Sequence, residues 1–450
     1  MGFKQSHFVA RLITLLPICI AANVHAEQQF TDDNNYCQNQ RTLKSQDNNL
    51  RRQLDTDNPL PDTANNRKIV AIELEQLNVF NTELEEENNF LFRFANRAHM
   101  TTEPEVIHSV LLFEEGDVYN PRKLLESERL LRKQGYLYDA RINAKLDCDG
   151  NVHVKVITRD LWTLLPEISF SRSGGENESS IGFRESNFLG WGKRVSFSRT
   201  RDADRTGYLF VYDDPHIFSS RYQGRLEYSD NDDGKRHYLD VSYPFFSIDT
   251  PYSYGVTSYS DQRRESLYYR GDVVSEFEQK TILNRAYFGH SSQLGNSWTQ
   301  RIKLGVENRK DTFKAISLTN LPIAEDRTLS YPYVSGQWFE DHYVKVRNFD
   351  SIYRTEDLNL GWNIHALLGY SSKDFSDDAS RTIYSLSLSK AHYSGDNQLW
   401  RFKADLDGYW NEETDDVENL FASTQLQYYL NTTLKPVSNK QLTPPTKKDG

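Results

Sequence analysis

Three cysteines are the residues of this chain best suited to a covalent cross-link. Cys19 lies in an apolar N-terminal segment that we expect to be removed, so Cys37 and Cys148 remain. In an oxidising compartment two such thiols can pair. The loop between them exceeds a hundred residues. For a loop of this length the chain-entropy model predicts that a disulfide stabilises the fold by about 4–5 kcal/mol, from which any strain in the bond is subtracted. We predict a Cys37–Cys148 disulfide, with two free thiols as the alternative.

No other group of side chains predicts catalysis or metal binding. The sequence lacks a nucleophile elbow, a zinc-protease motif, a phosphate-binding loop and a dinucleotide glycine motif. The paired carboxylates Asp232/Asp233 and Asp377/Asp378 stand in polar loops, where solvated charge explains them. A weak calcium or lipopolysaccharide-bridging role is the alternative for these pairs. We therefore expect no catalytic residues, no metal, no cofactor and no enzyme activity.

The chemistry of the second half of the chain lies in its alternation of apolar and polar residues. Between Trp400 and Asp407 the even positions are apolar and the odd positions are charged. Because the side chains of a strand alternate between its two faces, this segment has one apolar and one ionic face. A soluble β-sandwich would bury the apolar face in its core. An outer-membrane β-barrel exposes this face to lipid, and its charged side chains point into the aqueous lumen.

The same alternation predicts that the chain from Leu164 onward forms strands and turns and no helices. The acidic turn at 230–234 and the polar turn at 394–397 separate neighbouring candidates, and Lys310 to Arg327 is expected to be a longer loop. The candidate strands are 164–172, 179–187, 193–201, 206–213, 221–230, 236–245, 252–261, 281–290, 297–308, 329–339, 358–370, 381–393, 397–409 and 419–430.

The N-terminus and the composition favour export to a membrane. Residues 1–26 combine early positive charge, a short apolar run and a Val-His-Ala end, as in a secretory signal peptide. No later segment has the ~20 apolar residues of a membrane helix, so a membrane location would require a closed sheet. Aromatic residues make up 13% of the chain, which suits barrel girdles. The net charge of −11 argues against nucleic acid as a partner.

A mixed α/β unit is expected between a polar arm at 27–66 and the strands. Strand 68–74 is followed by helices at 91–98 and 103–112. A third helix begins after the N-cap Asn120 and ends before Gly135, with a stripe of Leu124, Leu125, Leu130 and Leu131. Strands 138–146 and 152–158 flank a turn. We expect one three-stranded sheet with helices on one face.

Four motifs then resemble one known superfamily. Phe113, Gly116, Asp117 and Tyr119 form an F-x-x-G-D-x-Y pattern, which a helix and the strand start Gly135-Tyr136 follow. This arrangement resembles a POTRA domain. The junction 158–166, the N-x-x-G-x-G pattern of residues 187–193 and the D-P-x-x-F turn of residues 213–218 are similar to barrel motifs of the outer-membrane assembly and surface-antigen superfamily. Its members include the core of the β-barrel assembly machinery, autotransporter-assembly relatives and two-partner secretion pores.

The resemblance implies a fold and a function. The fold is a periplasmic α+β POTRA-like domain at 67–160, then an all-β antiparallel transmembrane barrel at 161–434, with a disordered tail at 435–450. The implied function is to receive unfolded outer-membrane or secreted client proteins, by strand addition, and to insert or translocate them. The implied partners also include outer-membrane lipid or lipopolysaccharide and a periplasmic or lipoprotein accessory protein.

The resemblance also assigns residues to these roles. For the client-binding edge of the POTRA-like domain we expect Tyr138, Ala140, Ile142 and Ala144. The barrel's first strand would form one side of a gate, with Leu165, Ile168 and Phe170 as its residues. We expect the protein in the bacterial outer membrane, with its N-terminal domain in the periplasm.

Two departures from the superfamily pattern leave alternatives open. A late R-G-F/Y loop motif has no counterpart, since Arg270-Gly271-Asp272 comes too early and lacks the aromatic residue. The chain supplies roughly ten to fourteen strands, fewer than the family barrel, and lacks a terminal aromatic strand. A C-terminally incomplete barrel is the simplest expectation, and closure as a smaller barrel or by association is another. A passive porin or adhesin and a non-functional remnant are the alternative functions.

Overall fold

The computed structural model describes residues 66–430, apart from 174–175, 203–204, 296, 317–322, 348, 351–353, 377–378 and 395–397. The expected signal peptide, the polar arm, the C-terminal tail, Cys37 and Asp377/Asp378 fall outside the described residues. None of the helices in the described ranges combines the length and the apolar character needed to cross a membrane.

The first compact part is a three-stranded sheet with helices, as the sequence predicts. Its strands are β1 (Ile69–Leu77), β2 (Leu137–Leu146) and β3 (Val152–Asp160), in the order β1-β3-β2. Strand β3 runs parallel to β1 and antiparallel to β2. The remaining elements are the 3-10 turn η3 (Glu85–Glu87), α3 (Phe90–Ala98), α4 (Pro104–Val110) and α5 (Pro121–Lys133).

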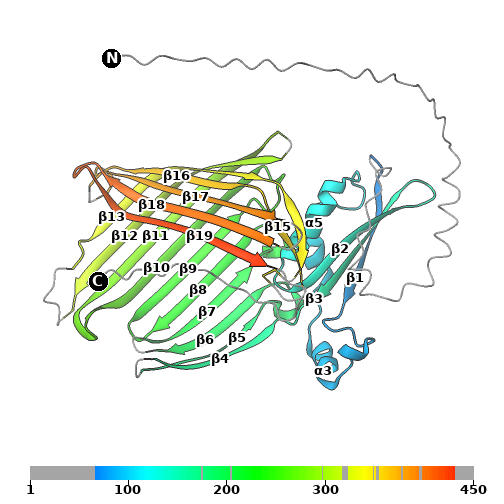
Figure 1. Cartoon of the computed structure of the whole chain (residues 1–450), viewed down its shortest axis with the longest axis horizontal. Coiled ribbons are helices and arrows are strands. Elements are labelled where there is room, and N and C mark those ends of the chain that lie inside the picture. Colours follow the sequence, from blue (N-terminus) through cyan, green and yellow to red (C-terminus); the bar gives the residue numbers. More distant parts are fainter. Residues whose placement is uncertain are drawn as a thin grey trace, which may run out of the picture. The chain divides into compact units, whose positions relative to one another are not determined.

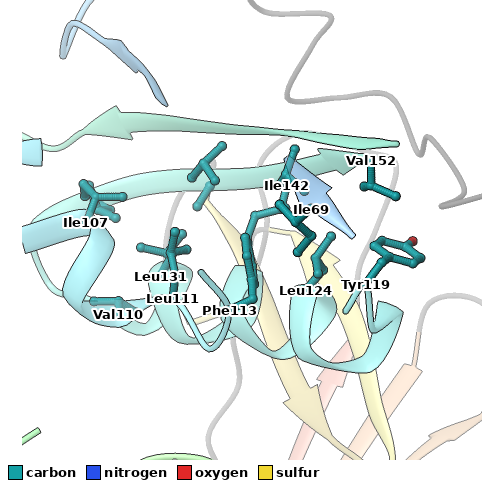
Figure 2. Close-up of a cluster of buried hydrophobic side chains, with 14 of the residues drawn as sticks. Ile69, Ile107, Val110, Leu111, Phe113, Tyr119, Leu124, Leu131, Ile142 and Val152 are labelled. Atoms are coloured by element: carbon teal, nitrogen blue, oxygen red, sulfur yellow. The ribbon is translucent and has the colours of Figure 1, made fainter. Parts of the chain in front are cut away.

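Helix α5 covers the sheet through one face. The side-chain oxygen of Asn120 accepts hydrogen bonds from the amides of Arg122 and Lys123, and Pro121 occupies the first turn. Leu124 and Leu131, seven residues apart, are buried in the core that Figure 2 shows. Leu125, which we expected in the same stripe, is 52% exposed, because its position on the helix lies outside the arc shared by residues 124 and 131.

The F-x-x-G-D-x-Y segment fixes the start of β1. Phe113 and Tyr119 are buried in the core. Between them Gly116 adopts φ +93°, a conformation that favours glycine. The Gly116 amide donates to the Ile69 carbonyl at 2.8 Å, and the Ile69 amide donates to the Asp117 carbonyl at 2.9 Å. This turn therefore extends the outer edge of β1 with backbone hydrogen bonds.

Gly135 and Tyr136, the predicted strand start, differ in how far they are buried. Tyr136 is buried against the core, at 2% exposure. Gly135 is exposed and has no left-handed backbone. The helix ends instead with Gln134 in an extended conformation, its amide donating to the Leu131 carbonyl at 3.0 Å.

The second part is a fourteen-stranded antiparallel sheet in which each strand pairs with the next one along it, from β4 to β19 (Figure 1). Its strands are β4 (Leu164–Ser173), β5 (Glu176–Glu185), β6 (Arg194–Arg201), β7 (Thr206–Asp214), β8 (Gln223–Asn231), β9 (Gly234–Tyr243), β10 (Tyr252–Tyr269), β11 (Asp272–Leu294), β12 (Trp298–Ala315), β13 (Arg327–Glu340), β16 (Asn363–Ser371), β17 (Arg381–Ser394), β18 (Gln398–Asn411) and β19 (Asp416–Leu430).

This architecture confirms the predicted fold class of an α+β domain followed by an antiparallel barrel sheet. All fourteen candidate strands overlap strands of the sheet. Strand β12 runs on to Ala315, so the first residues of the expected 310–327 loop belong to a strand. Within the described ranges β4 pairs only with β5, and β19 pairs only with β18.

The two faces of the sheet differ as the alternation predicts. Phe288, Leu304, Val334 and Leu368 are paired across four neighbouring strands, and each is more than two-fifths exposed. On the opposite face Glu307 is buried and accepts hydrogen bonds from Arg285 at 2.7 Å and from the Tyr331 hydroxyl at 2.8 Å. An apolar outer face and an ionic inner face are the pattern of a barrel wall in lipid.

A further hairpin of β14 (Tyr343–Arg347) and β15 (Thr355–Asn359) lies between β13 and β16 and forms a separate two-stranded sheet. The sequence analysis missed it, because the candidate strand 358–370 joined the end of β15 to β16. Successive strands alternate in direction, so the β13–β16 connection leaves the large sheet at the same end as the segment that enters β4.

Candidate client-binding edge and its contacts

Strand β2 is an edge strand of the small sheet, as a client-binding edge requires. The side chains of Ala140 and Ile142 are buried in the domain core, and Ala144 packs against that core. Tyr138 is half-buried, with the Arg159 guanidinium 4.9 Å from its ring centre. At Ala140, Ile142 and Ala144 an incoming strand would therefore meet the backbone of β2 rather than its side chains.

Two charged side chains of α5 already bind part of that backbone. The Ile142 amide donates to Glu128 Oε2 at 2.9 Å, and Arg132 Nη1 donates to the Ala140 carbonyl at 3.1 Å. Both groups point away from β3, so they belong to the outer edge of β2. The outer edge is therefore occupied by Glu128 and Arg132 at residues 140–142, and client access is expected toward Ala144.

The β14–β15 hairpin binds the same corner of the domain. Asp357 receives two hydrogen bonds from the Arg132 guanidinium, each 2.7 Å long. Arg354 Nη2 donates to the Leu137 carbonyl at 2.9 Å, at the start of β2. The Thr355 hydroxyl donates to Asp139 Oδ2 at 2.7 Å. The hairpin thus attaches the small α+β domain to the sheet through polar contacts with α5 and β2.

Glu128 is the centre of the charge network at this corner. Its side chain is 3% exposed and pairs with Arg132, and Lys345 Nζ of the hairpin lies 3.0 Å from its Oε1. Burial alone would raise the pKa of Glu128, but Arg132, the Ile142 amide and Lys345 outweigh it, so that the pKa is lowered. The carboxylate is therefore held in its charged form.

Asp139 and Glu126 behave in the opposite way. Burial raises the pKa of Asp139, against the hydrogen bonds from Thr355 and the Ala140 amide. Burial likewise raises the pKa of Glu126, although its Oε1 accepts a 2.6 Å hydrogen bond from the Ile248 amide in the β9–β10 connection. This corner of the domain therefore contains carboxyl groups whose pKa values are shifted in opposite directions.

A cavity of about 450 Å³ lies at the junction of α5, the β9–β10 connection and the hairpin. Its lining includes Glu126, Arg129, Arg132, Phe246, Phe339 and Asp357. The lining is mixed polar and aromatic, and the described residues contain no cluster of His, Cys, Asp or Glu that could hold a metal ion.

The predicted gate strand β4 is an edge of the large sheet. Ile168 and Phe170 are 65% and 79% exposed and share one face. Leu165 is 46% exposed but lies on the other face, because β4 pairs with β5 without a bulge and odd and even residues alternate. The three residues that we named together therefore do not share a surface.

The first hairpin motif joins the two parts of the chain. Gly190 has φ +79°, and a Cβ at this position would lie 2.5 Å from the Thr101 carbonyl oxygen. The Glu103 amide donates to the Gly190 carbonyl at 2.9 Å, and Asn187 Nδ2 donates to Thr102 Oγ1 at 2.9 Å. Only a glycine allows this close approach between the turn and the small domain.

Cys148 is disulfide-bonded. The partner that we predict, Cys37, lies outside the described residues, so the Cys37–Cys148 pairing stays a prediction.

Comparison with known protein families finds a match for the small domain. Residues 93–158 match the family model described as "POTRA: Surface antigen variable number repeat". No curated protein matches the chain.

Solved structures that resemble the chain include CdiB from Acinetobacter baumannii, at 12% identity and a TM-score of 0.40, covering 82% of this chain and 61% of that one. CdiB from Escherichia coli matches at 14% identity and a TM-score of 0.40, covering 81% and 70%. BamA from Haemophilus ducreyi lacking POTRA domains 1–3 matches at 12% identity and a TM-score of 0.29, covering 83% of this chain and 82% of that one. The chain thus spans 61% of the first structure's length.

Residues 93–158 thus match a POTRA family model, and the described residues that follow them form a fourteen-stranded antiparallel sheet.

Proposed function

We propose that this protein receives unfolded client proteins in the periplasm and inserts them into, or translocates them across, the bacterial outer membrane. The observation that carries the proposal is the pairing of a POTRA domain with a barrel sheet whose first strand, β4, is an edge. In this proposal the POTRA domain lies in the periplasm and the apolar face of the sheet contacts lipid or lipopolysaccharide.

The backbone of β4 supports strand addition at this edge. Pro166 lies within β4 and has no amide hydrogen. Proline is tolerated in an edge strand where the missing N–H would point away from the neighbouring strand. With a period of two residues, the backbone groups of Ile168 and Phe170 then also point away from β5. A client strand would find these groups without partners in the sheet and could pair with them.

The POTRA domain would deliver the client to β4. We propose that the client first pairs with the outer edge of β2 near Ala144, beyond the segment that Glu128 and Arg132 occupy. Strand β3 ends at Asp160 and β4 begins at Leu164, so only three residues separate the two sheets. An accessory periplasmic protein or lipoprotein would bind the same domain.

Site-specific photocrosslinking in cells tests this function. A photoreactive amino acid is placed at Phe170 on β4 or at Lys145 on β2, the exposed neighbour of Ala144, with Leu304 on the apolar face of the sheet and Leu125 on α5 as exposed controls. We expect crosslinks to newly exported proteins at positions 170 and 145 and none at the controls. Equal client crosslinking at all four positions, or none at 170 and 145, would refute the proposal.

A passive pore is the second candidate, because the inner face of the sheet is ionic. Arg309 Nε donates to Asp311 at 2.9 Å and the Thr281 hydroxyl donates to the same carboxylate at 2.7 Å. Such a face suits an aqueous lumen. Solute flux through vesicles that contain the purified protein, together with absent client crosslinks, would favour this candidate.

A further inference from the structure

Helix α3 of the POTRA domain turns its apolar face away from the domain. Phe90, Leu91 and Phe94 are 76%, 64% and 57% exposed, and Met100 just after the helix is 55% exposed. Residues 90 and 94 are one turn apart and residue 91 lies beside them, so the three side chains form one stripe. Single exposed apolar residues are ordinary, but a contiguous group of this kind marks an interaction surface.

The opposite face of α3 is firmly attached to the domain. The Phe92 ring stacks on Phe80 with ring centres 4.0 Å apart. Asn96 exchanges two hydrogen bonds with the Phe80 backbone, at 2.9 and 2.7 Å. Ala95 is buried. The helix therefore has a fixed orientation, and the exposure of Phe90, Leu91 and Phe94 follows from it.

The residues that follow α3 contact the first turn at the end of the barrel sheet. His99 Nε2 and the Thr102 amide each lie 2.8 Å from Asp160 Oδ2, four residues before β4 begins. Glu103 is bonded to the turn through the Gly190 carbonyl and through Trp191 Nε1, the latter at 3.1 Å. The C-terminal end of α3 is therefore tied to the border where β4, β5 and β6 begin or end.

That turn carries its own exposed apolar side chains. Phe188, Leu189 and Trp191 are 38%, 41% and 42% exposed, and the two aromatic rings pack edge to face. Phe218, in the next turn at the same end of the sheet, is 96% exposed. Aromatic residues at the end of an apolar barrel wall are typical of the membrane–water interface. The chain that leaves α3 reaches this turn at Glu103, nine residues after Phe94, so the apolar stripe is tied to the same end of the sheet.

Charge along the edge of the stripe fits a lipid surface. Arg93 and Arg97 are exposed on α3, next to Phe90 and Phe94 along the helix surface. Long basic side chains beside an apolar helical face bind lipid phosphates while their stems cover acyl chains. The nearby Glu87 is held by Arg159 at 3.0 Å, which compensates its charge.

We propose that α3 is an interfacial helix that inserts Phe90, Leu91 and Phe94 into the periplasmic leaflet of the outer membrane. The inference rests on the proposed membrane location of the sheet. It attaches the POTRA domain directly to the membrane, in addition to the contacts of the β14–β15 hairpin that bind the domain to the sheet, and fixes which face of the domain faces lipid.

Lipid-borne quenching tests this contact in the full chain. A fluorescent amino acid replaces Leu91, Leu125 or Leu304, one at a time, and each protein is reconstituted into phosphatidylcholine vesicles with or without nitroxide-bearing lipids. The nitroxide lies near the headgroup for positions 91 and 125 and far down an acyl chain for position 304. Leu125 is the matched control, an exposed leucine on another helix of the same domain. Since interfacial helices sit about 5–10 Å into the headgroup boundary, we expect quenching at position 91 and none at position 125.

Position 304 separates this inference from the proposed membrane location. Quenching at 304 without quenching at 91 would overturn the inference and leave the membrane location standing, whereas no quenching at either would overturn both. Protection of position 91 from aqueous iodide without lipid quenching would show that protein covers α3, by the N-terminal arm, a client or a second copy, and would also overturn it. The same measurement at Phe94 guards against a substitution at 91 that disturbs the helix.

Discussion

At the scale of single residues, the corner between α5, β2 and the hairpin depends on one guanidinium. Arg132 is 3% exposed and bonds Glu128, Asp357 and the Ala140 carbonyl at once. A buried ion pair contributes little against a well-packed apolar alternative, but removing one partner leaves an uncompensated charge. Losing Arg132 leaves buried Glu128 with Lys345 and Arg141 as its remaining cationic partners and takes two hydrogen bonds from Asp357.

We expect Arg132→Ala to destabilise the POTRA domain by about 1–3 kcal/mol, the usual cost of leaving buried polar groups without their hydrogen bonds. Hydrogen exchange of the buried β3 amides in the full chain measures this cost. Arg122→Ala, on the exposed side of the same helix, should change stability by less than about 0.5 kcal/mol. Equal effects of the two substitutions would show that the Glu128 network does not stabilise the domain.

The buried carboxyl of Asp139 predicts a dependence on pH. Burial raises its pKa in the folded chain above the unfolded value, so the folded state holds the proton more tightly. Its contribution to stability is therefore present at low pH and is lost as pH rises from the unfolded pKa through the raised folded pKa. Asp139→Asn keeps an acceptor for the Ala140 amide and should remove this loss.

The measurement for Asp139 is the difference in POTRA stability between Asp139→Asn and the native chain, followed by hydrogen exchange across the acidic range. We expect the difference to grow in favour of the variant as pH rises. The lowered pKa of Glu128 has the opposite effect on the pH dependence of stability. Because Glu128 is present in both proteins, its contribution cancels in the stability difference between them. A constant difference across the range would contradict the raised pKa.

At the scale of elements, the hairpin β14–β15 holds the POTRA domain through contacts that lie outside the large sheet. Phe339 of β13 pairs with Asn363 of β16, so a short turn could replace residues 342–360 without changing the strand order. We expect this replacement to widen the distance distribution between spin labels on the POTRA domain and on the sheet. A matched change in the β8–β9 turn, at residues 232–233, should leave the distribution narrow, and an unchanged distribution in both would show that other contacts hold the domain.

The wall of the sheet makes a separate prediction at the same scale. Leu304 lies on the outer face and is 63% exposed, so Leu304→Arg would place a charge in lipid at a cost of about 2–4 kcal/mol near the bilayer midplane. Lys303, on the inner face, tolerates Lys303→Arg because its charge stays away from lipid. Urea unfolding in vesicles, followed by heat-modifiable migration, measures both variants. Similar losses for the two would mean that residue 304 does not face lipid.

The elements that the sequence predicts and those that it misses differ in the source of their stability. Alternation identifies the fourteen strands because apolar and polar side chains lie on opposite faces, as residues 400–407 show. The far ends of β10–β12 lack that alternation, as the consecutive residues Arg263 and Arg264 show. They pair through their backbones and through ion pairs such as Arg263–Asp261, so the predicted strands stop short. Strand β14 alternates in Tyr343–Arg347, but its place against α5 depends on ion pairs between residues far apart in the chain. The contacts of Glu128 with the β2 edge could not be predicted from the sequence for the same reason, because they join residues of different elements.

At the scale of the whole molecule, the two edges of the large sheet determine what the protein can bind. Within the described residues β4 and β19 each have one neighbouring strand. Unpaired backbone groups in hydrocarbon cost several kcal/mol each by general transfer estimates, so in a membrane these edges must pair with another strand. In our proposal the partner of β4 is the client.

Proline substitutions in β4 distinguish the free edge from the paired one. Phe170→Pro removes an amide hydrogen that, by its spacing from Pro166, points away from β5. We expect it to preserve the sheet and to abolish client crosslinking from a photoreactive residue at Ile168, while Phe170→Ala, which removes only the ring, should retain the crosslinks. Ser169→Pro removes an amide that points toward β5 and should weaken the β4–β5 pairing itself, seen as a loss of heat-modifiable migration. If Phe170→Pro crosslinks clients as well as Phe170→Ala does, the backbone of β4 does not receive them, and entry must occur elsewhere in the sheet.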